Sequence, residues 1–369
     1  MKPTIWIFSL EPIETRYTAQ WHSHVPALLK TNLGNRFNVV QIDGVQKNSQ
    51  LTPGAFLNFS DTNYWKSAQM CAFLEQHNQG KTSPNDHFIF TDAWNPTVIQ
   101  LKYMSALLGF NWTLHGLWHA GSYDPQDFLG RLVGNKPWVR NAEKSFFHAF
   151  DHNYFATNFH IKMFVTNLLN DYPTENPWLE EDLAGILHGE DTRFVRTGWP
   201  MEYMVDTLEN YCTNPKRDLI LFPHRIAPEK QVEIFRDLAT HLPQYEFVVC
   251  QDTQLDKHEY HKLLGRAKIV FSANLQETLG ISCYEGALVE AIPMVPDRLS
   301  YSEMYYEGFK YPSEWTQDLD SYLAHRQELC HHIIVTMTHY EKRLPQLHKQ
   351  AHDLTKQFFS ANKLLENLK

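Results

Sequence analysis

The stretch that decides the fold is Phe271-Ser272-Ala273-Asn274-Leu275-Gln276-Glu277-Thr278-Leu279-Gly280-Ile281-Ser282-Cys283-Tyr284-Glu285. Its apolar start indicates a buried strand that ends near Ala273, after which a polar loop leads into a helix beginning near Thr278 or Leu279. The first turn of a helix has unpaired backbone N–H groups and the positive end of the helix dipole, which together suit a diphosphate. Gly280 lets the backbone approach such a ligand closely. The stretch therefore predicts a phosphate-binding strand, loop and helix.

Two carboxylates flank this helix entry. Glu277 lies just before the predicted helix, and Glu285 follows eight residues later. The chain has 42 acidic residues, so a pair at this spacing is a weak signal when taken alone. Beside a bound diphosphate, however, each carboxylate can accept hydrogen bonds from neutral hydroxyl groups. A nucleotide sugar has this layout, with a ribose on one side of the diphosphate and a sugar on the other.

A second polar group follows the predicted strand 219–222. Arg225 and Lys230 lie in the loop after this strand, and Pro228 suits the first turn of the next helix. Two cations at the carboxyl end of a strand can clamp a diphosphate, and an arginine can do so through two parallel hydrogen bonds. The alternative is an ordinary charged surface loop.

Short apolar runs alternate with helix-like segments along most of the chain. Most of these runs are continuous rather than alternating, which is typical of strands covered on both faces in a parallel sheet. The predicted strands are 4–9, 37–42, 87–91, 112–117, 154–157, 218–223, 246–251, 268–273 and 292–296. Helix-like segments between them are 64–76, 95–108, 230–242 and 256–264. This order predicts an α/β protein.

The strands fall into two series, separated by a polar, proline-containing stretch. We place the crossing between domains at residues 198–217, which predicts an N-terminal domain over 1–200 and a C-terminal domain over 201–315. Residues 316–369 have helical spacing and are expected to cross back to the N-terminal domain. Two or more helices are expected in this tail, with an apolar stripe that Arg326 interrupts, formed by Leu319, Tyr322, Leu323, Leu329, Cys330, Ile333 and Met337.

In this order, the motifs resemble the retaining glycosyltransferases of family 4. That group carries an Arg…Lys pair after the first strand of its second domain and an E-x7-E motif at a later helix, as Arg225, Lys230, Glu277 and Glu285 do here. The following residues 286–295 resemble the group's small-residue helix and G-x-P-V strand, with Ala291 in place of glycine. The resemblance covers most of residues 218–305. It implies the GT-B fold, in which two Rossmann-like parallel-sheet domains face a cleft and a C-terminal helical tail packs back.

The resemblance also implies site roles. Arg225 and Lys230 would hold the diphosphate and stabilise charge on the departing nucleotide. Glu277 would hold the donor sugar and Glu285 the ribose, and further donor-binding positions are Thr278, Leu279 and Gly280. The implied co-substrate is a nucleotide-diphosphate sugar such as a UDP- or GDP-sugar, with no cofactor and no metal required.

The loop after the first strand carries candidates for acceptor binding. In family 4 this loop is rich in glycine, whereas residues 10–21 here contain none. Glu11, Arg16 and Tyr17 are the side chains that would contact the acceptor or a phosphate. The alternative is that this segment is simply the start of a helix.

A further candidate group surrounds His119. The predicted strand 112–117 leads into this histidine, and family 4 enzymes often have a histidine here that touches the donor sugar. We therefore include His119 among the catalytic candidates, with Trp118 and Tyr123 as acceptor-binding residues. Residues 112–125, 154–160 and 223–225 also resemble the tRNA-queuosine mannosyltransferase-like branch, and residues 10–21 resemble glycosyltransferases of tailed bacteriophages, some of which modify DNA.

These likenesses favour a modified base in nucleic acid as the acceptor, either a phage DNA hydroxymethylpyrimidine such as 5-hydroxymethylcytosine or tRNA queuosine. Aromatic and basic residues in the first domain agree with such an acceptor, namely Trp118, Tyr123, Arg131, Lys136, Trp138, Arg140 and Lys144. A solvated basic helix face is the alternative for this cluster. Alternatives for the protein are transfer to a glycan, lipid or small metabolite, and a non-catalytic GT-B-like binding protein.

Composition limits the partners. The net charge of −9 is uneven, because residues 1–170 carry 13 basic and 11 acidic side chains whereas residues 171–369 carry 20 and 31. A nucleic acid is therefore expected to touch only the first domain. The five cysteines are widely spaced and the apolar runs are short, so we expect neither disulfides nor a membrane span. The expected location is the cytoplasm, which is the host cytoplasm if the protein is phage-encoded.

Overall fold

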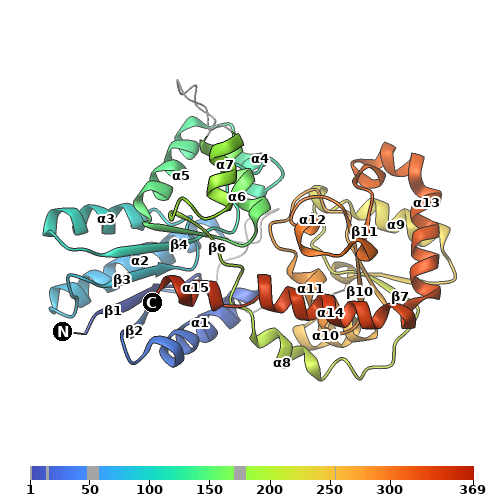
Figure 1. Cartoon of the computed structure of the whole chain (residues 1–369), viewed down its shortest axis with the longest axis horizontal. Helices are drawn as coiled ribbons and strands as arrows, with labels where there is room; N and C mark the ends of the chain where they lie inside the picture. The colour runs from blue at the N-terminus through green and yellow to red at the C-terminus, as the bar shows by residue number, and fades with distance from the viewer. Residues whose placement is uncertain (1, 14–15, 48–57, 170–179, 254) are drawn as a thin grey trace. The chain divides into compact units, whose positions relative to one another are not determined.

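The computed structural model describes residues 2–13, 16–47, 58–169, 180–253 and 255–369. The chain divides into two compact units, Met1–Pro200 with Ala361–Lys369, and Met201–Ser360. Each unit is built on its own parallel β-sheet with helices on both faces (Figure 1). The predicted α/β class, with two Rossmann-like parallel-sheet domains and a helical C-terminal segment, is confirmed.

The first unit has a six-stranded sheet in the order β2-β1-β3-β4-β5-β6. Its strands are β1 (Thr4–Phe8), β2 (Asn38–Ile42), β3 (His87–Phe90), β4 (Thr113–Leu117), β5 (His152–Phe155) and β6 (Phe194–Arg196). All neighbouring strands run parallel, for example with Ile5 opposite Val39 on one side and His87 on the other. The chain moves outward from β1 to β2 and then returns past β1 to β3, so the order reverses between β1 and β3.

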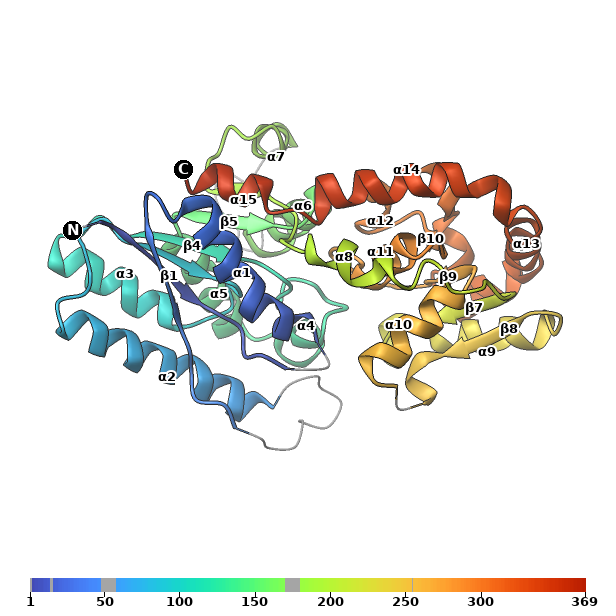
Figure 2. The same ribbon diagram turned by 90° about the horizontal axis from the view of Figure 1, so that it is seen from below.

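Helices cover both faces of this sheet. They are α1 (Tyr17–Leu33), α2 (Phe59–Asn78), α3 (Thr97–Leu108), α4 (Phe128–Val133), α5 (Pro137–Ala149), α6 (Asn158–Phe164), α7 (Glu180–Leu187) and α15 (Asn362–Asn367), with a π-helical turn at Val165–Leu169. Because crossovers between parallel strands are right-handed, reversing the direction of travel puts α1 on the face opposite α2 and α3 (Figure 2). Phe73, Leu101 and Phe146 on α2, α3 and α5 pack with Phe88 in one buried core.

The second unit has a five-stranded sheet in the order β11-β10-β9-β7-β8. Its strands are β7 (Leu219–Phe222), β8 (Glu246–Val249), β9 (Ile269–Phe271), β10 (Ile292–Pro296) and β11 (Lys310–Tyr311). Its helices are α8 (Tyr203–Glu209), α9 (Val232–His241), α10 (Lys257–Arg266), α11 (Ile281–Leu288), α12 (Tyr301–Met304), α13 (Leu319–Thr338) and α14 (Tyr340–Phe358). Helix α13 packs on α9, whereas α14 and α8 pack on α11. The strand order reverses between β7 and β9.

All nine predicted strands are present, and two short strands were missed. These are β6, which has three residues, and β11, which has two. Neither has an apolar run of its own, and each forms only because it pairs with the edge of a completed sheet. The units divide after Pro200, and α13 and α14 belong to the second unit while residues 361–369 belong to the first.

The interrupted apolar stripe expected in the tail is buried only in part, at Tyr322, Leu329, Ile333 and Met337. His325 has non-helical backbone angles (φ −111°, ψ 15°), so the helix axis breaks within α13. After the break Leu329 and Ile333 are fully buried, whereas Leu319 and Leu323 before it are 44% and 47% exposed. The break rotates the two halves of the helix relative to one another, which no regular helical spacing anticipates.

Candidate active site

The predicted donor-binding residues of the second unit follow β7 and β9, the two strands between which the strand order reverses. In open parallel sheets the loops at the carboxyl ends of such a strand pair diverge and leave room for a ligand. The loop after β7 carries His224, Arg225 and Lys230, and the loop after β9 carries Asn274 and Glu277. The fold thus brings together the two sequence motifs that lie about 50 residues apart.

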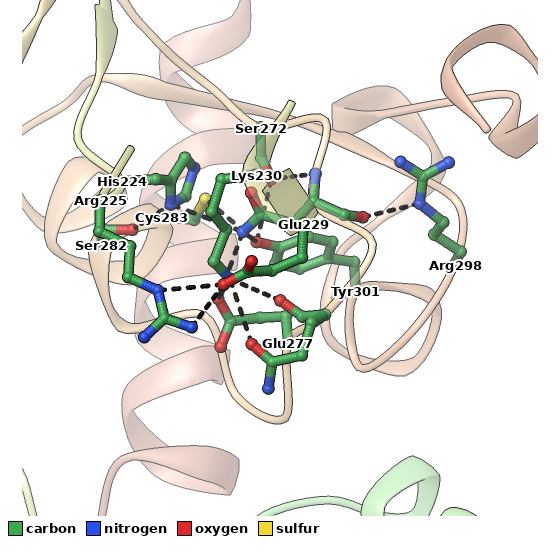
Figure 3. Close-up of polar contacts among 12 residues, drawn as sticks. His224, Arg225, Glu229, Lys230, Ser272, Glu277, Ser282, Cys283, Arg298 and Tyr301 are labelled. Carbon is green, nitrogen blue, oxygen red and sulfur yellow. Dashed lines mark hydrogen bonds and ion pairs between the residues drawn. The ribbon is translucent and has the colours of Figure 1, made fainter. Parts of the chain in front are cut away.

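Lys230 joins the two loops. Lys230 ends a 3₁₀ turn at Pro228–Lys230, and only 6% of the surface of this residue is exposed. Its Nζ donates to the backbone oxygen of Gln276 at 2.5 Å and lies 3.5 Å from Oε2 of Glu277. Lys230 and Glu277 therefore form a partly buried ion pair at the carboxyl edge of the sheet (Figure 3).

Glu277 is held as a carboxylate. Burial by itself would raise its pKa, but the positive charge of Lys230 and the backbone N–H groups of Gly280 and Leu279 outweigh burial and lower the pKa below the ordinary value. Asn274 Nδ2 also donates to Glu277 Oε2, at 3.3 Å. An ionised, hydrogen-bonded carboxylate with a fifth of its side-chain surface exposed can accept hydrogen bonds from the hydroxyl groups of a ligand.

His224 packs beside this pair in its neutral form. Its Nε2 donates to the backbone oxygen of Phe271 at 3.2 Å, which leaves Nδ1 to accept from Ser282 Oγ at 3.3 Å. Burial, followed by the nearby positive charge of Lys230, lowers the pKa of His224 to about 3. His224 is therefore a neutral hydrogen-bonding residue at physiological pH.

Arg225 is the more accessible of the two predicted cations. Its Nε and Nη2 donate to Oε1 of Glu229 at 3.1 and 2.5 Å, and the side chain of Glu229 is fully buried. The Arg225 side chain keeps 30% of its surface exposed. A buried carboxylate thus holds Arg225 in place while part of its surface stays open to an anion.

The helix entry differs slightly from the expectation. Helix α11 begins at Ile281, with Gly280 as its N-cap in the left-handed region (φ 75°), so Thr278 and Leu279 lie in the loop before it. A Cβ atom on Gly280 would lie 2.7 Å from the ring of Tyr301. Glycine is therefore needed here both for its backbone angle and for the close approach of an aromatic ring.

Glu285, on α11, is engaged with α10. Its Oε2 accepts from the hydroxyl of Tyr260 at 2.9 Å, and its Oε1 lies 3.9 Å from Nε2 of His261. The structure therefore places Glu285 beside α10, while Glu277 pairs with Lys230. The predicted ribose-binding role of Glu285 stays a prediction.

Sequence reasoning missed several residues of this cluster. These are His224, Ser282, Tyr301 and Arg298 (Figure 3), together with Asn274. Tyr301 donates or accepts at Ser272 Oγ (3.1 Å) and accepts from Asn274 Nδ2 (3.1 Å). Asn274 and His224 flank predicted site residues in the sequence and could have been found by their position. Tyr301 and Arg298 follow β10 without a motif of their own, so only the fold reveals them.

In the first unit, Tyr17 and His119 meet at the carboxyl edge of the sheet. The Tyr17 hydroxyl lies 2.7 Å from His119 Nδ1, and His119 Nε2 lies 2.6 Å from the backbone oxygen of Thr91. Because the carbonyl can only accept, Nε2 carries the proton and Nδ1 accepts from Tyr17. Burial lowers the pKa of His119, so the ring is neutral. Trp21 and Trp199 pack around both rings.

Glu11 and Arg16 lie near this aromatic cluster, which we define as Tyr17, Trp21, His119 and Trp199. Glu11 is 8% exposed, and burial followed by the charge of Asp61 raises the pKa of its carboxyl group. Arg16 is the N-cap of α1 and lies 5.7 Å from the centre of the Tyr17 ring. Both residues keep their predicted place in the loop after β1.

Trp118 and Tyr123 were predicted to bind the acceptor, and the structure contradicts this prediction for both residues. Both are 0% exposed and belong to the buried core of the first unit. The Trp118 indole donates to Asn153 at 2.8 Å, and the Tyr123 hydroxyl lies 2.7 Å from His160. Their surfaces are covered, so neither residue presents a side chain to an acceptor.

Asp92, which follows β3, was not predicted. Its Oδ1 accepts from the backbone N–H of Trp94 at 3.1 Å, and its Oδ2 lies 3.5 Å from Lys66 Nζ. Burial by itself would raise the pKa of Asp92, but the positive charge of Lys66 and the hydrogen bond from the backbone N–H of Trp94 lower it. The carboxyl edge of the first sheet thus holds one ionised carboxylate beside the aromatic cluster.

The part of the chain that the structure describes contains neither a metal-binding group of side chains nor a membrane-spanning helix. No group of three or more His, Cys, Asp or Glu side chains among them is arranged to hold a metal ion. Within the same part of the chain, no helix combines the length and the apolar composition needed to cross a membrane.

Neither a protein-family model nor a curated protein sequence matches the chain. Solved structures do match it in fold. The catalytic domain of starch synthase IV from Arabidopsis thaliana, bound to ADP and acarbose, is 11% identical with a TM-score of 0.58 over 99% of this chain and 97% of that one. Sucrose-phosphate synthase from Thermosynechococcus elongatus is 12% identical with a TM-score of 0.60 over 100% and 97%.

A third match is HepE from Anabaena in complex with UDP, which is 12% identical with a TM-score of 0.53 over 100% of this chain and 99% of that one. The likeness extends over nearly the full length of all three structures. At this level of identity it establishes the fold, and the chain has the GT-B architecture of two parallel-sheet α/β domains shared by these structures.

Proposed function

We propose that the protein is a glycosyltransferase that moves a sugar from a nucleotide-diphosphate sugar to a hydroxyl group. The observation that carries the proposal is the joined pair Lys230 and Glu277, at the reversal point of the second sheet and directly before α11. A cation, an ionised carboxylate and a helix N-terminus at one sheet edge match the charge and hydroxyl pattern of such a donor. The matched structures bound to ADP and to UDP support this donor class.

In the proposed reaction, Arg225 and Lys230 stabilise the negative charge that develops on the departing diphosphate. Positive groups fixed in place before the reaction lower the barrier because they need no reorganisation as charge develops. Glu277 and Asn274 hold the sugar hydroxyls. The acceptor oxygen attacks the anomeric carbon, the bond to the diphosphate breaks, and the acceptor proton passes to the leaving phosphate. Retention of configuration is part of the proposal and rests on the resemblance to family 4.

We further propose that the acceptor is a modified base in nucleic acid. Two features of the first unit support this choice. Residues 1–170 are slightly basic, Trp138 on α5 is 62% exposed, and Lys136 and Arg131, which precede it in the chain, are exposed as well. An exposed aromatic ring among cations can stack on a base and contact phosphates. A cytoplasmic location and independence from metal stay predictions.

The donor proposal is tested by binding and turnover with the full chain. A panel of UDP-, GDP- and ADP-sugars is titrated calorimetrically into the wild type and into Glu277→Gln, with Glu366→Gln as a matched control on α15. We expect one donor to bind the wild type and the control, and to bind Glu277→Gln at least 10-fold more weakly. Binding of no donor by the wild type would refute the proposal.

The acceptor proposal is tested by mass spectrometry of nucleosides. The protein and its donor are incubated with DNA containing 5-hydroxymethylcytosine or with queuosine-containing tRNA, and a mass increase of one sugar is expected on one nucleoside. Transfer to a glycan, lipid or metabolite instead would replace this acceptor. Donor binding without transfer or donor hydrolysis would favour a non-catalytic binding protein.

A further inference from the structure

Arg298 lies two residues after β10 and reaches the loop that follows β9. Its Nε donates to the backbone oxygen of Asn274 at 2.8 Å, and its Nη2 donates to that of Ala273 at 2.8 Å. The same guanidinium donates to the backbone oxygens of Ser313 and Thr316, each at 3.0 Å. One side chain therefore links the donor loop, defined here as residues 273–277, to the segment that precedes α13.

Gln231 reinforces this link from the loop after β7. Its Nε2 donates to the backbone oxygen of Ala273 at 2.6 Å and to that of Thr316 at 2.8 Å. Gln231 has a φ of 52°, a left-handed conformation that is unfavourable for a residue with a side chain. Such strain persists where surrounding contacts stabilise it, and here the amide of Gln231 reaches two of the four backbone oxygens that Arg298 contacts.

The donor loop is also held on its opposite side. In a trans peptide the C=O and N–H groups point in opposite directions. The C=O of Asn274 faces Arg298, and the N–H of Leu275 in the same peptide donates to the backbone oxygen of Glu229 at 2.8 Å. Both edges of this peptide are therefore bonded, so its orientation is fixed.

Fixing this peptide fixes the side chain that precedes it. Asn274 is 0% exposed, and its Nδ2 contacts Glu277 Oε2 and the Tyr301 hydroxyl. Arg298 and Arg225 lie on opposite sides of the cluster around Glu277 (Figure 3). Arg225 partly faces solvent, whereas the bonds of Arg298 to the loop go to backbone oxygens.

We propose that Arg298 is a positioning residue that orients the donor loop so that Asn274 and Glu277 meet the sugar of the nucleotide sugar. This inference rests on the proposed function. Arg298 acts through the loop and does not contact the sugar. Lysine cannot replace it, because a single ammonium group lacks the planar array of donors that bonds four carbonyl oxygens at once.

The test compares Arg298→Lys with Arg343→Lys. Arg343 is a matched control, since it also donates to a backbone oxygen of the second unit, that of Gly308 at 2.6 Å, away from the donor loop. UDP-glucose and UDP are titrated calorimetrically into the wild type and both variants. If the panel of nucleotide sugars described above identifies a tighter donor, that donor and its nucleotide replace UDP-glucose and UDP. Hydrogen exchange of the peptide 272–280 is measured in parallel.

For Arg298→Lys we expect at least 10-fold weaker binding of the nucleotide sugar, less than 3-fold weaker binding of the nucleotide alone, and faster exchange in the peptide 272–280. Arg343→Lys should match the wild type in all three. Millimolar guanidinium should restore part of the sugar-dependent affinity to Arg298→Ala. If Arg298→Ala does not fold, Arg298→Lys decides the question.

Two results would contradict the inference about Arg298 and leave the proposed function intact. One is unchanged nucleotide-sugar affinity in Arg298→Lys, and the other is an equal loss for nucleotide and nucleotide sugar. Either result would make Arg298 a general support of the second unit. A wild-type chain that binds no nucleotide sugar overturns the proposed function and this inference with it, so the two failures are distinguishable.

Discussion

The reversal points of the two sheets differ in chemistry. In the second unit, the loops after β7 and β9 bring together charged and amide groups, with Lys230 and Glu277 at the centre. In the first unit, where the order reverses between β1 and β3, the segments after β1, β4 and β6 bring together the aromatic cluster, beside the ionised Asp92 that follows β3. The His119 ring in this cluster is neutral and accepts from Tyr17. The same topology thus presents a site built on charged and amide groups in one unit and an aromatic cluster beside one ionised carboxylate in the other.

This difference shows what the shared topology does and does not decide. It places loops from neighbouring parallel strands at one edge, and the residues in those loops decide what can bind. Fixed charges suit a diphosphate, which is charged throughout a reaction. Aromatic faces with few charges suit a neutral ring or a base. Four predictions test the contrast, from the largest expected effect to the smallest.

Removing the charge of Glu277 should have the largest effect. Glu277→Gln keeps the side-chain shape but leaves Lys230 without its ionised partner, so we expect sugar transfer to fall about 100-fold or more. Release of nucleotide diphosphate measures the rate, and circular dichroism checks the fold. Glu366→Gln on α15 should retain activity. Activity of Glu277→Gln within twofold of the wild type would contradict a functional role for the charged site.

Truncating Trp118 should affect stability rather than catalysis. The ring is fully buried and stacked 6.3 Å from that of Phe155, so Trp118→Ala should lower the free energy of unfolding of the first unit by about 3–5 kcal/mol. Urea denaturation measures this loss, and donor affinity in the second unit should be unchanged. Trp138→Ala, at the exposed ring on α5, should change stability by less than about 0.5 kcal/mol. An unfolding midpoint of Trp118→Ala equal to that of the wild type would contradict the burial of the ring and make Trp118 a candidate for acceptor binding again.

Acid should destabilise both units through buried histidines. Burial lowers the pKa of His160 in the first unit and of His224 in the second to about 3, below the ordinary value of about 6.5. Between these values the unfolded chain binds more protons than the folded chain, so the free energy of unfolding falls as pH drops below about 6.5. Above that pH both states are neutral at these residues and the contribution is constant.

Urea midpoints at pH 7.5, 6.0 and 5.0 measure this effect. His160→Gln should show a weaker dependence on pH than the wild type in the first unit, while the second unit keeps its own. A wild-type midpoint that does not change from pH 7.5 to 5.0 would show that the histidines are accessible to protons in the folded state.

Removing one hydroxyl from the aromatic cluster should have the smallest effect on stability. Tyr17→Phe keeps the ring but deletes the hydrogen bond to His119, which should cost about 1 kcal/mol. If the cluster contacts the acceptor, KM for the acceptor should rise while the affinity for the donor is unchanged. Equal changes for both substrates would contradict the separation of the two sites.

Much of the fold was predictable, because buried parallel strands require continuous apolar runs. All nine predicted strands formed, and Lys230 meets Glu277 as the order of their strands requires. Trp118 was predicted to bind the acceptor but is buried, because the sequence pattern of an aromatic residue after a strand is the same whether its ring faces solvent or the core. Arg298 was missed because its bonds go to backbone oxygens, and these have no sequence signature.

The sequence by itself determined the α/β class, the two strand series and the charged residues in the loops after β7 and β9. These features follow from local apolar patterning and from residue type. Only the tertiary structure decided the break in α13, the burial of Trp118 and Tyr123, the pairing of Tyr17 with His119 and the hold of Arg298 on the donor loop. Each of these depends on which distant segment packs against a residue, and burial, pKa and hydrogen-bond partners are all set by that packing.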